Sequence, residues 1–273
     1  MSQVDELNSK IDLLRRGNKG FITNSFIPAR QLAAMVRSDG ITIKMSNDTV
    51  IILAEEEQLV RLYFYASNIK SLRQLPLMIP LNISKMIILD IIGKNPGAEI
   101  MSNELEKHNF YTYGELIRMK RKNEEEMPEN ISDVFYAGTD DIDEIMEILY
   151  EEFDILISRL PTIRKLEEAI SNREVTIVRQ QDLLAGLAYF EKPGVKLKYL
   201  YQIVVRNGFR GRGITDDLLV YTFRNTPKDT VFQLWVETKN ERAINKYRKH
   251  GFTPDGLVAY IMLCKGNNDG KDI

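Results

Sequence analysis

The stretch from Tyr199 to Tyr221 constrains the fold most, because it sets three kinds of local structure in a fixed order. Residues 199–205 are mostly β-branched and aromatic, as in a β-strand, and residues 214–221 have the pattern of a helix start. The loop between them carries glycines at 208, 211 and 213 together with Arg210 and Arg212. Glycines let a backbone come close to a ligand, and a helix N-terminus presents unpaired N–H groups. Strand, basic glycine loop and helix together predict an anion site, with phosphate the preferred guest.

This site lies on a nearly neutral chain. The 273 residues are 44% hydrophobic and 28% charged, which is ordinary for a globular protein with material for two modest cores. Lysines and arginines number 37 and acidic residues 39, so the net charge is 37 − 39 = −2. No global basic field would recruit nucleic acid or an anionic membrane, and we expect neither as a partner. Any anion site must therefore be local.

Cysteine content and hydropathy limit the cellular compartments that we expect for this protein. Cys264 is the only cysteine, which excludes an internal disulfide and any multi-cysteine metal site, and it fits a reducing compartment. We expect no metal. No apolar run reaches the roughly 18 residues of a membrane span, and the first residues lack the pattern of a secretion signal. These features predict a cytoplasmic protein.

A charged segment divides the chain. Residues 120–130 are nearly all charged or polar and end in a proline segment, which is typical of a domain boundary. The alternative is a solvated loop inside one domain, but complete element patterns resume on both sides. We therefore expect an accessory α/β domain at 1–122, a charged linker at 123–130, a second domain at 131–265 and a flexible polar tail at 266–273.

Apolar spacing predicts helices and strands in both halves, and hence an α/β (α+β) fold. In the first half we expect helices at 4–16, 28–36 and ending at 105–108, and strands at 41–44, 49–54, 59–65, 86–92 and 116–120, with 70–84 irregular. In the second half we expect strands at 134–137, 175–178, 184–190, 199–205, 230–236 and 257–264, and helices at 140–157, 162–170, 214–225 and 242–250.

Two short motifs in the second half resemble a known family. Arg210-x-x-Gly213-x-Thr215 opens a helix, and Asn240-x-x-Ala243-Ile244-x-x-Tyr247-x-x-x-Gly251-Phe252 follows the next strand. This order, over roughly residues 131–265, resembles the GNAT superfamily of acetyl-CoA-dependent N-acetyltransferases. The resemblance implies a mixed, mostly antiparallel central sheet flanked by helices. Thr215 stands where the family usually has glycine or alanine, although its hydroxyl is able to donate to a phosphate oxygen.

The resemblance also implies how acetyl-CoA would be held. The pyrophosphate would accept hydrogen bonds from the loop backbone, and the pantetheine arm would pair like an extra strand with β-strand residues just before the loop. Asp216 and Asp217 oppose a nearby polyphosphate, so we expect them to point away, with Arg210 and Arg212 supplying compensation. The predicted cofactor residues are Ile203, Val204, Val205, Arg210, Gly211, Arg212, Gly213, Ile214 and Thr215.

Amine acetylation needs a general acid and a general base. Tyr247 matches the tyrosine that the family uses as general acid, although a tyrosine on such a helix also suits a core. Many family members carry a glutamate at the position of Trp235, and Glu237 shares a strand face with Trp235, so Glu237 is our first candidate base. Tyr199 or Tyr201 acting through ordered water is the second. Asn240 would contact the cofactor arm or cap the helix. The helix-end histidines, His108 and His250, are better explained by capping or the helix dipole.

The two halves share a weak internal repeat. Lys107-His108-Asn109-Phe110 parallels Lys249-His250-Gly251-Phe252 at an offset of 249 − 107 = 142 residues, and an apolar strand precedes each. The first half therefore resembles a degenerate GNAT domain of partial topology. Its residues 67–86 hold no glycine loop, so we expect it not to bind CoA. It would instead wall off the acceptor site or support a homodimer.

Two functions from different classes remain open at this point. The first is an N-acetyltransferase that moves an acetyl group from acetyl-CoA to a primary amine of a small molecule or peptide, by direct transfer in a ternary complex. The second is a non-catalytic CoA-binding regulatory or assembly module. The fold does not choose the acceptor.

Overall fold

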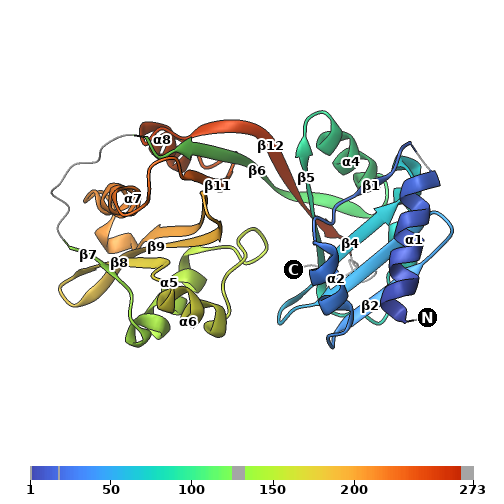
Figure 1. The fold of residues 1–273 in the computed structure, drawn as a ribbon, viewed down its shortest axis with the longest axis horizontal. Coiled ribbons are helices and arrows are strands. Elements are labelled where there is room, and N and C mark those ends of the chain that lie inside the picture. The colour runs from blue at the N-terminus through green and yellow to red at the C-terminus, as the bar shows by residue number, and fades with distance from the viewer. Residues whose placement is uncertain (1, 18, 125–132, 266–273) are drawn as a thin grey trace. The chain divides into compact units, whose positions relative to one another are not determined.

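The computed structural model describes residues 2–17, 19–124 and 133–265 (Figure 1). Most of the expected linker, and the expected tail at 266–273, lie outside the described residues. The chain forms two compact units: unit 1 holds residues up to Leu116 together with those from Gly256 onward, and unit 2 holds Ile117–Asp255. Among the described residues, no helix combines the length and the apolar character that crossing a bilayer demands.

Unit 1 is a mixed sheet with helices on both faces. Its strands β2, β3, β4, β5, β12 and β6 lie side by side in that order, and β1 pairs with β4. The strands are β1 (Ile22–Thr23), β2 (Ile41–Met45), β3 (Thr49–Glu55), β4 (Leu59–Ala66), β5 (Met86–Lys94), β6 (Phe110–Lys122) and β12 (Thr253–Cys264). The helices are α1 (Gln3–Gly17), α2 (Ala29–Val36), the 3-10 helix η1 (Ile69–Gln74), α3 (Leu75–Met78) and α4 (Gly97–Glu106).

Alternation along β3 gives unit 1 two cores. Val50 and Ile52 pack with residues of α1 and α2, whereas Ile51 and Leu53 pack with residues of η1 and α4. Successive strand residues point to opposite faces, so a strand that is apolar throughout must be covered on both sides.

Unit 2 is also a sheet between two helix layers. Strands β6, β11, β10, β9, β8 and β7 follow one another in it. The strands are β7 (Val134–Tyr136), β8 (Val175–Gln180), β9 (Leu183–Gly194), β10 (Leu197–Val205) and β11 (Val231–Glu237). The helices are η2 (Thr139–Asp141), α5 (Ile142–Glu152), α6 (Ile163–Ser171), η3 (Asn207–Phe209), α7 (Ile214–Arg224) and α8 (Glu241–Lys249).

The two helix layers of unit 2 build separate cores. One core joins α7 and α8 to one sheet face through residues such as Leu218, Ile244 and Phe232. The other joins α5 and α6 to the opposite face through residues such as Ile145 and Leu166. The helix starts are set locally: the Thr162 hydroxyl accepts from Lys165 N at 3.3 Å and the Asn240 side chain accepts from Ala243 N at 3.0 Å.

The two halves of the chain repeat the same order of elements. In each half a helix pair leads to an antiparallel β-meander, a helical crossover, a strand parallel to the last one, a further helix and a long strand. The parallel pairs are β4 with β5 and β10 with β11. In the first half the crossover is only η1 and the four-residue α3, without a glycine loop. The first half therefore repeats the topology of the second, as the weak sequence repeat suggested.

The boundaries of the two units differ from those expected at 123–130. Strand 257–264 was expected in the second domain, but it pairs antiparallel with β5, from Leu257 opposite Lys94 to Leu263 opposite Ile88. Tyr260 and Met262 accordingly join a core of unit 1. Conversely, the last residues of β6 lie beside β11 in unit 2. The last strand of each half, β6 and β12, thus ends in the other unit. A domain boundary in the charged segment therefore does not separate the two units.

Candidate active site

A β-bulge in β10 creates the central irregularity of unit 2. Leu200 lies opposite Phe190 of β9, but the next pair is Gln202 with Tyr189, so Tyr201 is an extra residue in β10. The bulge reverses the side-chain alternation: Leu200 belongs to the α7–α8 core and Val204 to the α5–α6 core. Gln202 also faces the α5–α6 side, where its amide donates to Arg159 O at 3.0 Å.

The bulge coincides with a separation of two parallel strands. β10 pairs with β11 from Leu197 opposite Val231 to Leu200 opposite Leu234, and the pairing stops there. Beyond it Ile203, Val204 and Val205 pair only with β9 among the described strands. Their other edge faces the gap, and an unpaired strand edge offers N–H and C=O groups to an extended guest.

The loop after β10 has the backbone of an anion site. Gly211 and Gly213 have φ of +83° and +86°, and no atom of the described residues lies within 4 Å of where a Cβ would stand at either. Gly213 is the N-cap of α7, an 11-residue helix. Within the described part of the chain, no hydrogen bond uses the backbone N–H groups of residues 211–215. Unpaired N–H groups at a helix N-terminus are suited to a phosphate.

The arginines of the loop brace it to neighbouring elements. Arg210 forms an ion pair with Glu152 of α5, and its Nε donates to Val205 O at 3.1 Å. Arg212 donates to the Gln180 side chain at 2.9 Å and to Gly208 O at 3.2 Å. The guanidinium groups therefore hold the loop in shape, and the site as it stands offers a ligand mainly backbone N–H groups.

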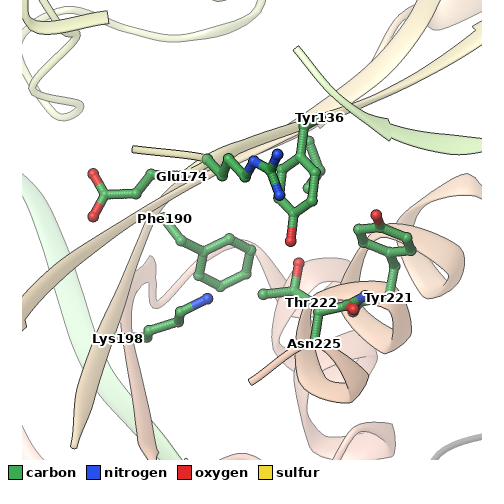
Figure 2. A pocket seen from close by; sticks show the side chains of 9 residues that line it. Tyr136, Glu174, Phe190, Lys198, Tyr221, Thr222 and Asn225 are labelled. Atoms are coloured by element: carbon green, nitrogen blue, oxygen red, sulfur yellow. The ribbon is translucent and has the colours of Figure 1, made fainter. Parts of the chain in front are cut away.

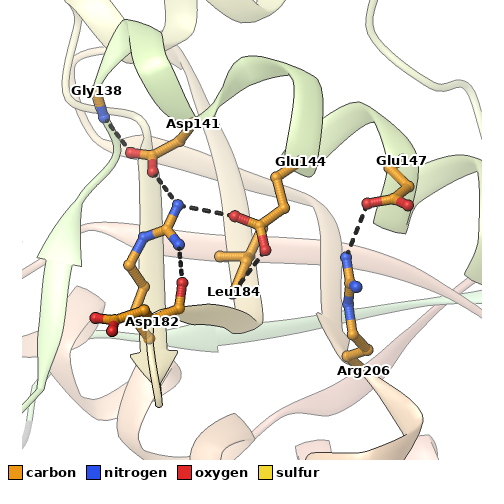
Figure 3. Close-up of polar contacts among 8 residues, drawn as sticks. Gly138, Asp141, Glu144, Glu147, Asp182, Leu184 and Arg206 are labelled. Atoms are coloured by element: carbon orange, nitrogen blue, oxygen red, sulfur yellow. Dashed lines mark hydrogen bonds and ion pairs between the residues drawn. The ribbon is translucent and has the colours of Figure 1, made fainter.

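A second set of ion pairs fixes α5 beside this loop (Figure 3). Arg206, the residue after β10, donates to Glu147 at 3.2 Å. One turn earlier on α5, Glu144 accepts from Leu184 N at 2.8 Å and from Arg179 at 2.9 Å. Acidic side chains along one face of α5 thus attach it to β8, β9 and the loop entry.

The two acidic residues in the first turn of α7 lie in different surroundings. Asp216 pairs with Lys246 of α8 at 2.8 Å and with His250, the C-cap of α8, at 2.6 Å. Burial would raise the pKa of Asp216, but the hydrogen bonds from Lys246 and His250 outweigh it and lower that pKa. Burial and the neighbouring Asp216 raise the pKa of Asp217. Lys246 and His250 thus compensate the charge of Asp216.

Tyr247 lies on the buried face of α8. It is 8% exposed and packs edge-on against Phe252, with ring centroids 5.7 Å apart. Burial raises the pKa of its hydroxyl, so the group stays protonated at neutral pH. No hydrogen-bond partner of the Tyr247 hydroxyl occurs among the described residues. Asn240 caps α8 through its side-chain oxygen, and only its amide nitrogen is left for a ligand.

Glu237 and Tyr247 are placed on opposite faces of β11. Val236 packs in the same core as Tyr247, and Glu237 is the next residue in the alternating strand. Glu237 forms an ion pair with Lys239 at 3.0 Å and is largely screened from solvent. By the same alternation it shares the α5–α6 side of the sheet with Trp235, as expected. The two predicted catalytic residues therefore do not form one side-chain cluster.

An aromatic and acidic group on β9 and β10 escaped the sequence reasoning. Tyr189 and Glu191 of β9 lie beside Tyr199 and Tyr201 of β10, and Tyr189 donates to Glu191 at 2.5 Å. The rings of Tyr201 and Tyr189 stack at 5.7 Å. Burial raises the pKa of Tyr199 to about 12, which disfavours its service as a base at neutral pH. The alternation in Tyr189-x-Glu191 and in Tyr199-x-Tyr201 indicates that each pair shares a strand face. Whether the two pairs meet depends on the register of β9 against β10, which the sequence does not reveal.

Two hollows lie near this region. The first, of about 10 Å³, is only large enough for a water molecule. Figure 2 shows the Lys198 amine and the Thr222 hydroxyl facing it, and the Glu174 carboxylate turned away. Burial, assisted by Lys192, lowers the pKa of Lys198. The second hollow, of about 220 Å³, lies between α6 and β9 and has Lys165, Glu168, Tyr189 and Glu191 in its wall.

The comparisons with known proteins agree on one fold. The model of the acetyltransferase (GNAT) family matches residues 142–252. A GCN5-related N-acetyltransferase from Kribbella flavida is 15% identical with a TM-score of 0.59, over 87% of this chain and 93% of its own. One from Sphaerobacter thermophilus is 15% identical with a TM-score of 0.57, over 89% and 95%.

A solved tandem structure matches both halves. The tandem GNAT protein from the clavulanic acid biosynthesis pathway is 10% identical with a TM-score of 0.57, over 98% of this chain and 96% of its own. At these identities the likeness concerns the fold. No curated protein sequence matched the chain.

Proposed function

Residues 142–252 form a domain of the GNAT acetyltransferase family, and we propose that this protein transfers an acetyl group from acetyl-CoA to a primary amine by direct attack in a ternary complex. The family generally uses acetyl-CoA. The observation that carries the proposal is the open edge of β10 beyond Leu200, leading directly to a loop whose backbone N–H groups are unpartnered among the described residues.

The residues present fit acetyl-CoA. Among the described residues, no atom lies within 4 Å of a Cβ placed at Gly211 or Gly213, so there is room in front of α7, where the N–H groups of residues 211–215 would hold the pyrophosphate. The free edge of Ile203–Val205 would pair with the pantetheine arm. When bound, acetyl-CoA supplies an acetyl group activated as a thioester, with a thiolate as leaving group.

Tyr247 is proposed as the general acid. Its burial keeps a proton on the hydroxyl at neutral pH, and that hydroxyl has no competing acceptor among the described residues. A thiol has a pKa near 8.5, well below that of a buried phenol. Proton transfer from Tyr247 would therefore be useful mainly while negative charge develops on sulfur, which is where general acids contribute most.

The acceptor must lose a proton before it attacks. A lysine-like amine has a pKa near 10.4, so deprotonating it at neutral pH costs on the order of 4 kcal/mol. Glu237 remains our first proposed base. Tyr199 or Tyr201 acting through ordered water remains the second, although the raised pKa of Tyr199 counts against that residue. We further propose a small-molecule or peptide amine as acceptor and, from the single cysteine, a cytoplasmic location.

The test is release of CoA thiol from acetyl-CoA in the presence of a panel of primary amines. We expect amine-dependent thiol release matched by N-acetylated product in mass spectrometry. Silence across the panel, together with tight CoA binding, would contradict the transferase and favour a CoA-responsive module instead.

A further inference from the structure

The ammonium of Lys165 occupies a cation site built from β9 and β10. Its Nζ lies 2.8 Å from a Glu191 carboxylate oxygen and 5.6 Å from the centroid of the Tyr201 ring. A carboxylate combined with an aromatic face is the chemistry that recognises alkylammonium ions. Lys165 lies on α6, whereas the residues that hold its ammonium lie on β9 and β10.

The site is preorganised without Lys165. Tyr201 is fixed between Tyr189, at 5.7 Å between ring centroids, and Tyr199, at 5.3 Å. Glu191 is held by the hydrogen bond from the Tyr189 hydroxyl, and Tyr189 itself is 2% exposed. The side chains that hold Tyr201 and Glu191 thus belong to the sheet itself and do not depend on the lysine.

Lys165 is held weakly. Its side chain is 55% exposed, and Tyr201 is 39% exposed. Exposed ion pairs contribute little net free energy, so the lysine can leave at small cost. The hollow of about 220 Å³ beside it has Glu168, Glu174 and Glu191 in its wall, against Lys165 and Lys192. With Lys165 withdrawn, three acidic groups face one lysine and the hollow favours a cation.

The cation site adjoins the proposed acetyl-transfer site. Tyr201 is the extra residue of the β10 bulge, and Ile203, the first residue of the edge proposed to pair with the pantetheine arm, is two residues further on. Two strand residues span roughly 7 Å. An amine on Tyr201 would thus lie about one short side chain from the backbone edge proposed for the thioester.

We propose that the acceptor is an aliphatic primary ammonium that binds against Glu191 and on Tyr201, at the position which Lys165 holds in the structure. This inference rests on the proposed function for its link to acetylation, but the binding site itself does not. Because the occupant here is a lysine side chain, the shared chemistry is a straight four-carbon ammonium. A free alkylamine and a lysine in a peptide are its two sources.

The test measures binding of n-butylammonium chloride to the full chain without acetyl-CoA, by ligand-observed NMR titration. 1-Butanol, a neutral molecule of similar shape, is the ligand control. Lys165→Met should lower the Kd of n-butylammonium by roughly threefold or more, because the internal competitor is gone. A gain in affinity cannot come from misfolding. Glu191→Gln and Tyr201→Leu should raise the Kd by roughly threefold or more, whereas Tyr201→Phe keeps the aromatic face and should change it little.

Glu167→Gln, at an exposed α6 position, is the matched control for the loss of one acidic charge and should leave the Kd unchanged. Equal binding of 1-butanol, or wild-type affinity in Glu191→Gln and Tyr201→Leu, would overturn the inference. Acetylation is scored separately with n-butylamine and with Nα-acetyl-lysine methylamide, which represent the two sources. Charge-dependent binding without acetylation would contradict the proposed function and support the cation site. If acetylation occurs but its apparent KM for the amine is the same in wild type, Glu191→Gln and Tyr201→Leu, the proposed function would stand and the cation site would be contradicted.

Discussion

Asp216 Oδ1 lies 2.6 Å from His250 Nε2, which ties the first turn of α7 to the end of α8. These two helices carry the two sequence motifs, so the contact joins the proposed phosphate loop to the helix of Tyr247. Lys246 completes the arrangement at 2.8 Å from the other carboxylate oxygen. An acidic residue that seemed unfavourable beside a phosphate thus has a structural role in joining the two helices.

Asp216 and Asp217 should respond oppositely to neutralisation. Asp216→Asn should lower the free energy of unfolding by about 1 kcal/mol at pH 7, because Lys246 and His250 lose a charged partner. Asp217→Asn should be neutral or slightly stabilising, because its pKa is raised and its charge is disfavoured in the fold. Urea unfolding followed by the single tryptophan, Trp235 of unit 2, measures both.

The same pair has a pH signature. A carboxyl group with a lowered pKa stabilises the fold above its unfolded value, near 4, and that stability is lost as the pH falls through the lower, folded value. The difference in stability between wild type and Asp216→Asn should therefore shrink below about pH 4. A difference that stayed constant from pH 7 to pH 3 would mean that the carboxylate charge is not what Asp216 contributes.

Gly186 should be the most sensitive glycine of the β9–β10 pair. A Cβ there would stand 2.8 Å from Val204 O and 3.0 Å from a methyl group of Ile214, so β10 or α7 would have to shift. Gly186→Ala should cost roughly 1–3 kcal/mol of unfolding free energy. Gly194→Ala is the control, because a Cβ at this position of the same strand has no atom of the described residues within 4 Å. Equal stability of the two variants in urea would refute this close approach.

The sequence predicted the parts of the site that depend on local order. The strand, glycine loop and helix at 199–224, and the helix carrying Tyr247, are set by residues near one another in the chain. The cap at Asn240 is equally local, because its side chain bonds a backbone group three residues away. The family resemblance followed from these same local motifs.

Long-range pairing was beyond such reasoning. The pattern of residues 257–264 predicted a strand but gave no reason to place it beside β5 rather than within its own half. The bulge at Tyr201 is likewise a matter of register, since one extra residue brings Tyr201 and Gln202 to the same side of the sheet. Glu191 lies beside Tyr201 only because of that register, so the cation site could not be predicted from the sequence.

Alkaline pH should destabilise the protein through its buried tyrosines. The pKa of Tyr199 is raised by burial to about 12, against an ordinary value of 10. Below pH 10 both folded and unfolded states hold the proton and the stability is complete; between pH 10 and 12 the unfolded state loses it first, so stability falls. Tyr199→Phe should reduce that fall by on the order of 2 kcal/mol.

Circular dichroism during urea unfolding at pH 9 to 12 measures this fall. Tyr150→Phe, at an exposed position on α5, is the control and should track the wild type. A Tyr199→Phe variant with the same alkaline slope as the wild type would show that Tyr199 is not protected from ionisation in the fold.

Tyr247→Phe should separate catalysis from packing. Phenylalanine keeps the edge-on contact with Phe252, so stability should change by less than about 1 kcal/mol. Loss of the proton donor should lower kcat roughly a hundredfold, with little effect on the KM for acetyl-CoA. Steady-state thiol release with a responsive amine gives both constants. An unchanged kcat would remove Tyr247 from the mechanism.

The most direct test of the account is calorimetric titration of acetyl-CoA into the wild type and into the double variant Arg210→Ala, Gly213→Val. Valine is strained at the φ of +86° found at Gly213, and loss of Arg210 releases the loop from Glu152. Arg164→Ala, an exposed position on α6, controls for the loss of one positive charge. We predict saturable binding to the wild type and the control, and at least tenfold weaker binding to the double variant. Absence of binding to the wild type, or undiminished binding to the double variant, would contradict the assignment of residues 203–215 as the acetyl-CoA site.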